Sequence, residues 1–294
     1  MSGDGAADEV EPHVGPLIPR DEIPSWMRGL TDNVAAVSES VLRRGGDRAR
    51  WTTMLGRDRR AAAVLVLMSG AFEADPAYPG GLPHDADILL TERASTLRQH
   101  SGQIAFPGGS RDPGDDFPVG TALREADEET GLSPVGVDIV ATLPSFPVPP
   151  SGFDVTPVVA HWSAPSPVRV VDEGETARVA RVNMRRLLAP ESRFQVRRSV
   201  MGMRAYQGPA FYVDGLFVWG FTGGLIAAIA DAAGWDVPWD TEDVRPLEEM
   251  IERAGSPQQS GFSLPEAGRQ SGTESSSTSP HSSTSPHSAG EVSE

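Results

Sequence analysis

Cysteine is absent from this chain of 294 residues. Without thiols the protein can form no disulfide, no thiolate metal site and no cysteine nucleophile. Long apolar runs are missing as well: the most extended one, "GLFVWGFTGGLIAAIADAAGW" (215–235), is interrupted by glycines and falls short of a membrane-spanning helix. The first residues, "MSGDGAADEVEPHVG", are acidic and have no apolar centre. We therefore expect no secretory signal, no membrane contact and a cytoplasmic location.

Positive charge is also scarce. The sequence has 25 Lys and Arg against 41 Asp and Glu, which gives a formal net charge of −16. Non-specific nucleic-acid binding needs a basic surface that displaces counterions, so we expect no nucleic-acid partner. The same field repels a phosphate-bearing substrate. Such a substrate would need local arginines or bound metal cations.

The two ends of the chain differ from its middle in composition. Residues 1–24 are rich in Gly, Pro and acidic residues and predict a disordered, acidic N-terminus. Residues 25–58 begin with "SWMRGLTDNVAAVSESVLRR", whose apolar spacing predicts a helical extension with one or two short helices. Residues 254–294 are dominated by Ser, Thr, Pro and His, contain "SSTSPH" twice, and predict a disordered tail.

Residues 59–253 have the patterns of a folded α+β domain. Helical spacing is found over residues 119–130, and "TGGLIAAIADAA" (222–233) predicts a buried helix. The segment "TARVARVNMRRLL" (176–188) predicts a strand that runs into a helix. Apolar runs and alternating patterns predict strands at residues 61–69, 87–93, 103–106, 137–143, 153–162 and 210–221. We expect several mixed strands with flanking helices.

The helix predicted at 119–130 carries an unusual concentration of acid. Glu125 lies three residues before Glu128 and four before Glu129, so on a helix all three carboxylates project from one face. Like charges at this spacing cost the helix about 0.2–0.5 kcal/mol per pair. A multivalent cation would offset that repulsion, and ligands that are all oxygen favour Mg²⁺ or Mn²⁺ over zinc.

A solvated acidic helix face is the alternative interpretation, and the surroundings argue against it. Gly108 and Gly109 precede the acidic run and Gly131 follows it, where a helix C-cap is expected. Glycines let the backbone approach a ligand closely. Arg124 stands next to the carboxylates and could orient one of them by a bidentate bond.

The stretch "GGSRDPGDDFPVGTALREADEETGL" (108–132) resembles the Nudix box, a loop–helix–loop that binds metal and diphosphate. The second half of that motif, Arg-Glu-U-x-Glu-Glu-x-Gly-U with U apolar, matches "READEETGL" position for position. The first half departs from it. Asp116 stands where the motif has Glu, and Ser110 where it has Gly. The loop is one residue longer, which puts Asp115 at the equivalent distance from Gly109 and leaves open which aspartate serves the loop.

A second stretch, "LLTERASTLRQHSGQIAFPGG" (89–109), resembles the segment before the box in the coenzyme A pyrophosphatases of the Nudix superfamily. The chain also resembles this subfamily in three further stretches, "SGFDVTPVV" (151–159), "ETARVARVNMRRLL" (175–188) and "VWGFT" (218–222). The resemblance implies a Nudix fold, a mixed β-sheet between helices in α/β/α layers. It also implies metal-dependent hydrolysis of the coenzyme A diphosphate to 3′,5′-ADP and 4′-phosphopantetheine.

The resemblance further implies a set of site residues. For catalysis these are Arg124, Glu125 and Glu128. For Mg²⁺ or Mn²⁺ they are Glu125, Glu128, Glu129 and a backbone carbonyl near Gly109, and a metal held there would lower the pKa of an attacking water. For the substrate, a small molecule with an extra terminal phosphate, they are Arg93, Arg98, His100, Gly102 and Gly108.

Several alternatives stay open at this point. The general base could be Glu125 or a carboxylate outside the box, such as Glu173 or Glu175, and the loop function could fall to Asp115 or Asp116. The substrate could be another nucleoside diphosphate compound, such as NADH or ADP-ribose. The chain could instead be a non-catalytic nucleotide-sensing module, or a scaffold that uses its Ser/Thr-rich tail. The sequence does not define an oligomeric state.

Overall fold

The apolar run at 61–69 forms a strand that is buried on both faces. The computed structural model of the chain describes residues 12–44, 59–94, 102–148, 151–200 and 203–255. In it, strand β2 (Arg60–Ser69) lies in the middle of a large sheet, and its side chains alternate between two separate cores. Leu65 and Leu67 pack on one side, whereas Val66 and Met68 pack on the other. A strand inside a sheet covered on both faces needs this continuous apolar sequence.

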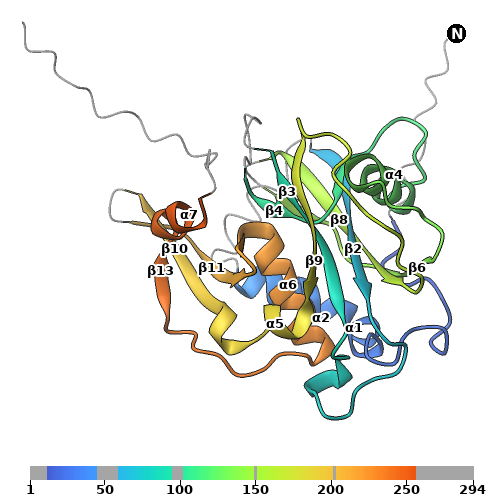
Figure 1. Ribbon diagram of the computed structural model, residues 1–294, viewed down its shortest axis with the longest axis horizontal. Helices are drawn as coiled ribbons and strands as arrows, with labels where there is room; N and C mark the ends of the chain where they lie inside the picture. The colour runs from blue at the N-terminus through green and yellow to red at the C-terminus, as the bar shows by residue number, and fades with distance from the viewer. Residues whose placement is uncertain (1–11, 45–58, 95–101, 149–150, 201–202, 256–294) are drawn as a thin grey trace, which may run out of the picture. The chain divides into compact units, whose positions relative to one another are not determined.

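Within the described residues, nine strands form the larger sheet (Figure 1). Its path is β1-β6-β8-β2-β3-β4, while β5 pairs with β2, β7 with β8, and β9 with β3. Strands β2 and β8 run parallel and the other pairs antiparallel, so the sheet is mixed. The remaining bounds are β1 Gly15–Pro16, β3 Asp87–Arg93, β4 Ile104–Ala105, β5 Gly108–Ser110, β6 Val137–Thr142, β7 Phe146–Val148, β8 Phe153–Trp162 and β9 Thr176–Asn183.

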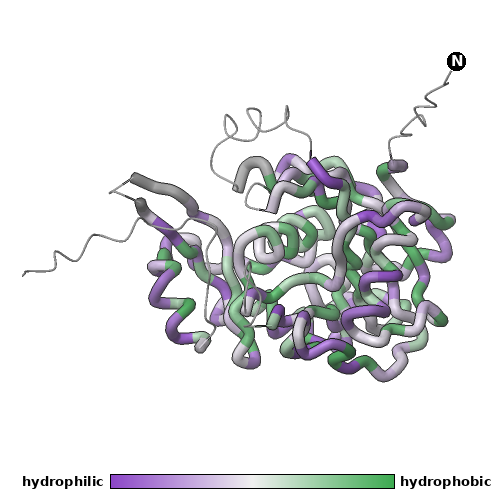
Figure 2. Tube along the Cα trace, turned by 90° about the horizontal axis from the view of Figure 1, so that it is seen from above, coloured by the Kyte–Doolittle hydropathy of each residue, from purple (hydrophilic) through white to green (hydrophobic). Residues whose placement is uncertain are grey.

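Helices cover both faces of this sheet. Helix α4 (Val119–Thr130) packs on one face through Ala122 and Ala126, whose small side chains let the helix come close. Helix α6 (Gly220–Ala233), which is apolar almost all round, covers the other face together with α1 (Arg28–Asp32) and α2 (Val34–Arg44). Figure 2 shows the hydrophobic segments concentrated inside and the hydrophilic residues along the outside. The expected α/β/α layering is confirmed.

A smaller sheet of four strands, in the order β12-β11-β10-β13, was not predicted as a separate unit of the described chain. It packs against α6 on one face and against α7 (Leu247–Ala254) on the other. The bounds are β10 Arg193–Val200, β11 Met203–Val213, β12 Leu216–Val218 and β13 Val244–Pro246. Short helical turns complete the fold: α5 Met184–Leu187, η1 Pro79–Gly81 and η2 Pro190–Ser192.

The N-terminal segment corrects one expectation. Residues 1–24 were expected to be disordered, but Gly15 and Pro16 pair with β6, and Ile23 is buried. The prediction is therefore wrong for residues 12–24, while residues 1–11 lie outside the described part. A composition averaged over 24 residues hides the few apolar side chains that reach the core.

The helical extension is an integral part of this core. Trp26, Met27 and Leu30 are all completely buried, and the ring of Trp26 lies 5.3 Å from that of Trp235. Gly29 faces the last turn of α6, where a Cβ would lie 2.7 Å from the carbonyl oxygen of Ala233. One or two short helices were expected, and two are present as α1 and α2. The rest of the predicted extension, residues 45–58, is outside the described residues.

The C-terminal boundary lies close to where the composition changes. Helix α7 continues to Ala254 and is capped by Gly255 in the left-handed conformation, so the predicted tail from 254 begins two residues too early. Residues 256–294 lie outside the described part. In the residues that the structure describes, no helix combines the length and the apolar character needed to cross a membrane.

Candidate active site

The acidic helix is held over a glycine-lined edge of the sheet. Strand β5 pairs with β2, with Ala63 opposite Gly109, and the chain then loops into α4. Gly131 ends α4 in the left-handed conformation, as predicted. The same helix that buries its alanines on β2 therefore presents its glutamates to the backbone of β5.

Gly108 and Gly109 are required by close packing. A Cβ at Gly109 would lie 2.4 Å from the carboxyl carbon of Glu125, and one at Gly108 would lie 2.4 Å from the carbonyl oxygen of Ala63. Gly108 also has a φ of +154°, which side chains disfavour. The two glycines thus allow β5 to lie between β2 and the Glu125 carboxylate.

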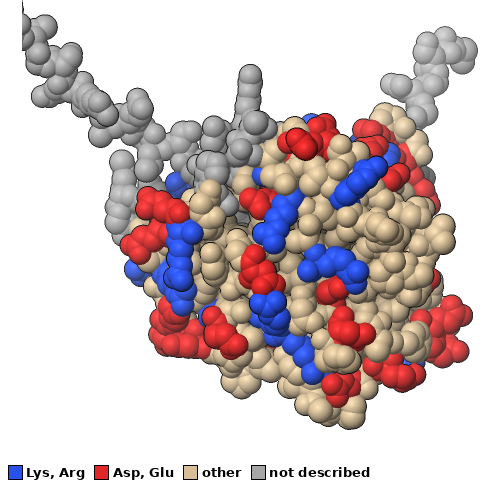
Figure 3. All heavy atoms as spheres, viewed as in Figure 1, with Lys and Arg blue, Asp and Glu red and all other residues tan. Residues whose placement is uncertain are grey.

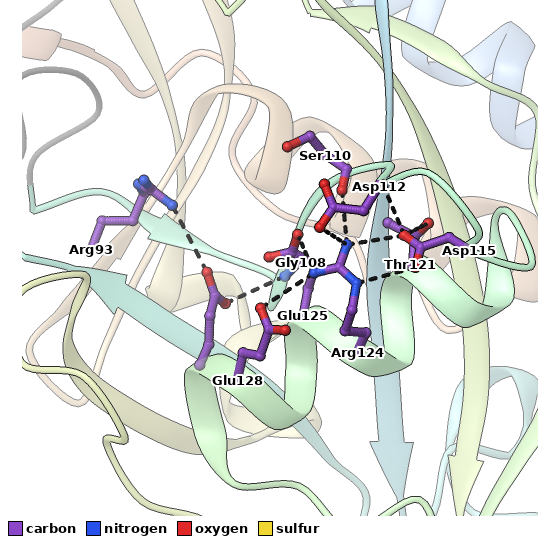
Figure 4. A network of polar contacts seen from close by, with 10 residues as sticks. Arg93, Gly108, Ser110, Asp112, Asp115, Thr121, Arg124, Glu125 and Glu128 are labelled. Carbon is purple, nitrogen blue, oxygen red and sulfur yellow. Dashed lines mark hydrogen bonds and ion pairs between the residues drawn. The ribbon is translucent and has the colours of Figure 1, made fainter.

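Arg124 is the centre of the polar network (Figure 4). Its Nε and Nη2 donate to the two carboxylate oxygens of Asp115 at 3.2 and 3.0 Å. Its Nη1 donates to Glu125 Oε1 at 3.0 Å and to Glu128 Oε2 at 3.2 Å. Nη2 also donates to the carbonyl oxygen of Ser110 at 3.0 Å. The predicted bidentate bond exists, but its acceptor is a loop aspartate and not a glutamate of the box.

Asp115, and not Asp116, is the aspartate that contacts the box. Besides Arg124, the Asp115 carboxylate accepts hydrogen bonds from the hydroxyl of Thr121 at 2.8 Å and the backbone N–H of Asp112 at 3.0 Å. The Arg124 guanidinium, with these two donors, holds the pKa of Asp115 well below its usual range. In turn, Asp115 raises the pKa of Arg124, and the charge of Glu125 adds to this. Asp116 is exposed.

The roles of Thr121, Ser110 and Asp112 were not predicted. Thr121 is three residues before Arg124, so the two side chains share a helix face and can both donate hydrogen bonds to one aspartate. This spacing could have predicted the role of Thr121. The contact with Ser110 is made by a backbone oxygen, and side-chain chemistry could not have predicted it.

Glu129 differs from the other two glutamates. Its side chain is only 8% exposed, whereas that of Glu128 is 60% exposed. The backbone N–H of Gly108 donates to Glu129 Oε2 at 3.3 Å, and Arg93 Nη1 lies 4.0 Å from Oε1. Burial raises the pKa of Glu129 to about 7, against the opposing effects of Arg93 and the Gly108 N–H.

Burial also raises the pKa of Glu125, and the neighbouring charge of Glu128 acts in the same direction while Arg124 opposes both. Two adjacent carboxylates therefore hold protons more tightly than free glutamate does. Groups of this kind, in which burial and like charges disfavour the ionised form, are concentrated at functional sites.

The oxygen donors suit Mg²⁺ or Mn²⁺, but they are not gathered into a ligand cluster. Over the residues that the structure describes, no group of three or more His, Asp or Glu side chains is arranged to hold a metal ion. Arg124 engages Glu125 and Glu128, whereas Glu129 points to Gly108 and Arg93. Cation binding by all three carboxylates therefore requires side-chain movement. The predicted ligand set stays a prediction.

The residues predicted to contact substrate are partly described. Arg93 ends β3 beside Glu129, and the buried Gly102, with a φ of +67°, donates its N–H to the Arg93 carbonyl at 2.9 Å. Arg98 and His100 lie outside the described residues. Glu175 accepts a backbone bond from Ala94 at 2.8 Å.

The two candidate bases outside the box, Glu173 and Glu175, are both exposed. The charge of Glu175 contributes to the raised pKa of Glu129, which places this glutamate within electrostatic reach of the site. Its backbone bond with Ala94, the residue after Arg93, also holds Glu175 beside the end of β3. Glu175 is therefore the better supported candidate of the two.

The fold and the site together define an α+β protein in which an acidic helix lies over a glycine-containing strand at one edge of the sheet. The NUDIX domain family matches residues 79–200 of the chain. The uncharacterized Nudix hydrolase NudL of Cronobacter sakazakii is 38% identical over 174 residues, which cover 59% of this chain and 82% of that protein. Its namesake in Escherichia coli K12 is 35% identical over 146 residues, covering 49% and 73%. The chain belongs to the Nudix hydrolase family and is a pyrophosphohydrolase.

Among solved structures, the Nudix hydrolase RenU of M. smegmatis is 27% identical, with a TM-score of 0.34 over 44% of this chain and 73% of that one. A MutT/Nudix family protein from Enterococcus faecalis is 18% identical, with a TM-score of 0.36 over 66% and 71%.

Proposed function

We propose that this hydrolase cleaves the diphosphate of coenzyme A or its derivatives, releasing 3′,5′-ADP and 4′-phosphopantetheine. The observation that carries the proposal is the position of Arg93. Its guanidinium lies 4.0 Å from the buried Glu129 carboxylate, and Arg93 is the last residue of β3, which ends in "LLTER". In a chain of net charge −16, this places a fixed cation directly beside the acidic box. A substrate with several phosphates needs cations at that position.

The chain's own residues would divide the work as follows. Glu125, Glu128, Glu129 and the Gly109 carbonyl would hold Mg²⁺ or Mn²⁺. When bound, the metal supplies positive charge against the charge that develops on the diphosphate oxygens.

The remaining residues position the substrate and the box. Arg93, with Arg98 and His100, would orient the phosphates. Asp115 and Arg124 keep the loop and the helix in register through their paired bonds. Glu125 and Glu175 are the candidate bases, each worth roughly 10²–10⁴-fold in rate if it takes the proton of the attacking water.

A second candidate is hydrolysis of another nucleoside diphosphate compound, such as NADH or ADP-ribose. This reaction would use the same box and would differ only in the part of the substrate that the substrate-binding residues recognise. A non-catalytic sensing role is less well supported, because all three box glutamates are present. The scaffold role leaves the box unexplained.

The test is a mass-spectrometric product screen with Mg²⁺ and with Mn²⁺. The panel contains coenzyme A, 3′-dephospho-coenzyme A, NADH, ADP-ribose and a nucleoside triphosphate. We expect the highest kcat/KM for coenzyme A, no turnover in EDTA, and a large loss of turnover in the Glu128→Gln variant. A higher kcat/KM for NADH or ADP-ribose would reject the substrate and leave the family assignment standing.

A further inference from the structure

Strand β6 is paired along only part of its outer edge. Strand β1 covers Thr142 and Ala141, and Leu17 donates its N–H to the Val140 carbonyl at 2.8 Å. The described chain then leaves the edge, so residues 137–139 have a strand partner only on the β8 side. In an antiparallel pair, alternate residues turn their N–H and C=O groups away from the partner. The Val137 N–H already donates to the Pro134 carbonyl at 3.1 Å, so the groups left for another strand are the remaining outward-facing N–H and C=O groups of residues 137–139.

A hollow of about 710 Å³ lies over this open edge. Its lining comes from both sides of the sheet. Val137 and Ile139 belong with Val119 to the α4 side, whereas Ile18 packs against the α6 side. Residues from the two faces can line one hollow only where it passes over the edge of the sheet.

The hollow combines apolar walls with acid. Leu17 and Phe72 each leave 42% of their surface exposed there. Three carboxylates, from Glu22, Asp116 and Asp138, share the same lining, which has no basic residue. Figure 3, in the same view as Figure 1, shows acidic side chains at the lower right of the molecule, where Figure 1 draws β6 and the N-terminal segment.

We propose that this edge is a docking site for an extended peptide segment of a partner protein, which adds a strand to β6 beyond the end of β1. Strand addition of this kind gains affinity from backbone bonds and specificity from alternate side chains. Directly opposite residues of an antiparallel pair share a face. The guest therefore needs an apolar side chain opposite Ile139, a Lys or Arg opposite Asp138, and an apolar side chain opposite Val137.

The acidic lining of the hollow favours a partner peptide over two other occupants, a second copy of this chain and the chain's own first residues. A second copy that joined edge to edge would bring its own three carboxylates against these three, in a chain of net charge −16. The first residues of this chain, "MSGDGAADEVE", are acidic as well and match the hollow poorly. A basic, apolar segment is complementary in both respects.

The experiment measures binding of a short fluorescein-labelled peptide of alternating valine and arginine to the full-length chain by anisotropy. We expect saturable binding, no binding of the matched valine–glutamate peptide, and at least about a tenfold weaker affinity for Asp138→Lys, because like charges then oppose. Glu191→Lys makes the same charge change on an exposed residue outside the hollow and should leave affinity unchanged.

A second probe separates strand addition from charge alone. The same peptide, N-methylated on alternate amides, keeps its side chains and net charge but blocks one hydrogen-bonding edge. Two such peptides exist, methylated on the odd-numbered or on the even-numbered amides. We expect at least one of them to lose binding. Binding of both methylated peptides as tight as that of the unmethylated peptide, or equal loss of affinity in Asp138→Lys and Glu191→Lys, would overturn the proposal. Dimerisation that is abolished by Asp138→Lys would also overturn it, since a second copy would then be the occupant.

Discussion

Glu129 is the residue at which folding and function conflict most clearly. In the fold its pKa is about 7, raised by burial from the ordinary 4.5. Between these pH values the folded chain binds a proton that the unfolded chain has lost, so stability falls as the pH rises from about 4.5 to about 7. A shift of this size corresponds to roughly 3 kcal/mol. The site therefore holds a carboxylate at some cost to the metal-free fold.

We predict that Glu129→Gln removes this pH dependence. Without metal, the variant should melt several degrees above wild type at pH 8 and close to it at pH 4.5, because the neutral amide avoids a buried charge. Turnover should be lost, since a ligand charge for the cation is gone. Thermal melts across pH 4–8 in EDTA check the first point and a turnover assay with Mg²⁺ the second. Parallel melting curves for the two proteins at all pH values would contradict the buried-charge explanation.

Asp115 and Asp116 form a natural matched pair for a second prediction. Asp115→Asn should disturb the loop, because a neutral amide cannot pair both oxygens with Arg124. We expect a lower Tm and a fall in kcat of up to about a hundredfold, the scale of a small misplacement of catalytic groups. Asp116→Asn should leave both unchanged. Equal effects of the two substitutions would show that the network around Arg124 does not position the box.

Arg98 tests whether the basic segment before the box reads the terminal phosphate. A charge-assisted bond to phosphate is worth about 1.5–3 kcal/mol, so Arg98→Ala should lower kcat/KM for coenzyme A by about ten- to a hundredfold. Cleavage of 3′-dephospho-coenzyme A should change much less. The ratio of the two kcat/KM values is the measurement. Equal slowing of both substrates would remove Arg98 from recognition of the 3′-phosphate.

At the scale of elements, long segments with strong hydrophobic periodicity could be predicted from the sequence, whereas very short strands could not. Strand β2 and helix α4 each carry an unbroken pattern, and both form over nearly the predicted residues. Strands β1 and β13 have two and three residues and exist only through their partners. Phe194 and Val196 alternate with polar residues in β10, but only the packing of α7 on them makes a second sheet.

The site was predictable to a similar degree. Helical spacing predicted that the three glutamates share one helix face, but in the structure Glu125 and Glu128 contact Arg124, whereas Glu129 contacts Gly108 and Arg93. The difference in burial between Glu129 and Glu128 could not be predicted, because the burial of Glu129 depends on the sheet beneath α4 and not on the helix alone. Nor could the choice of Asp115, since the loop is one residue longer than the motif it resembles.

The packing of α1 against α6 leads to a prediction about the N-terminal extension. Trp26→Ala removes a fully buried indole that lies against Trp235, and should lower the free energy of unfolding by about 3–5 kcal/mol. Urea denaturation measures it. Phe72→Ala, at a ring that is 42% exposed, is the comparison and should cost much less. A loss from Trp26→Ala no larger than the small loss expected for Phe72→Ala would mean that the extension contributes little to the core.

At the scale of the whole molecule, charge is mixed locally despite the large net value. On the face drawn in Figure 3, arginines lie among acidic residues. Among the described residues, Arg181 pairs with Asp87 at 2.6 Å and Arg185 with Asp75 at 2.5 Å. Both pairs are partly exposed, and ion pairs in contact with solvent contribute only about 0–1 kcal/mol each. The excess of acid outside these pairs then sets the field that a phosphate substrate meets.

The tail beyond α7 should be dispensable for folding and catalysis. Its Ser/Thr/Pro-rich composition cannot offset an ordering entropy of about 1–2 kcal/mol per residue. A chain that ends at Gly255, which retains the cap of α7, should keep the Tm and kcat/KM of the full chain. Differential scanning calorimetry and a turnover assay check this. A Tm lower by several degrees would show that the tail packs on the body.

The contact between Trp26 and Trp235 also gives the protein a built-in optical probe. The two indoles lie 5.3 Å apart at a tilt of 43°, one from the N-terminal extension and one from the segment after α6. A fixed, chiral arrangement of aromatic rings produces near-ultraviolet circular dichroism, which vanishes when tertiary packing loosens while helices persist. Because Trp162 of β8 and other aromatic residues add to the same spectrum, the difference between wild type and Trp26→Ala isolates the signal of this pair.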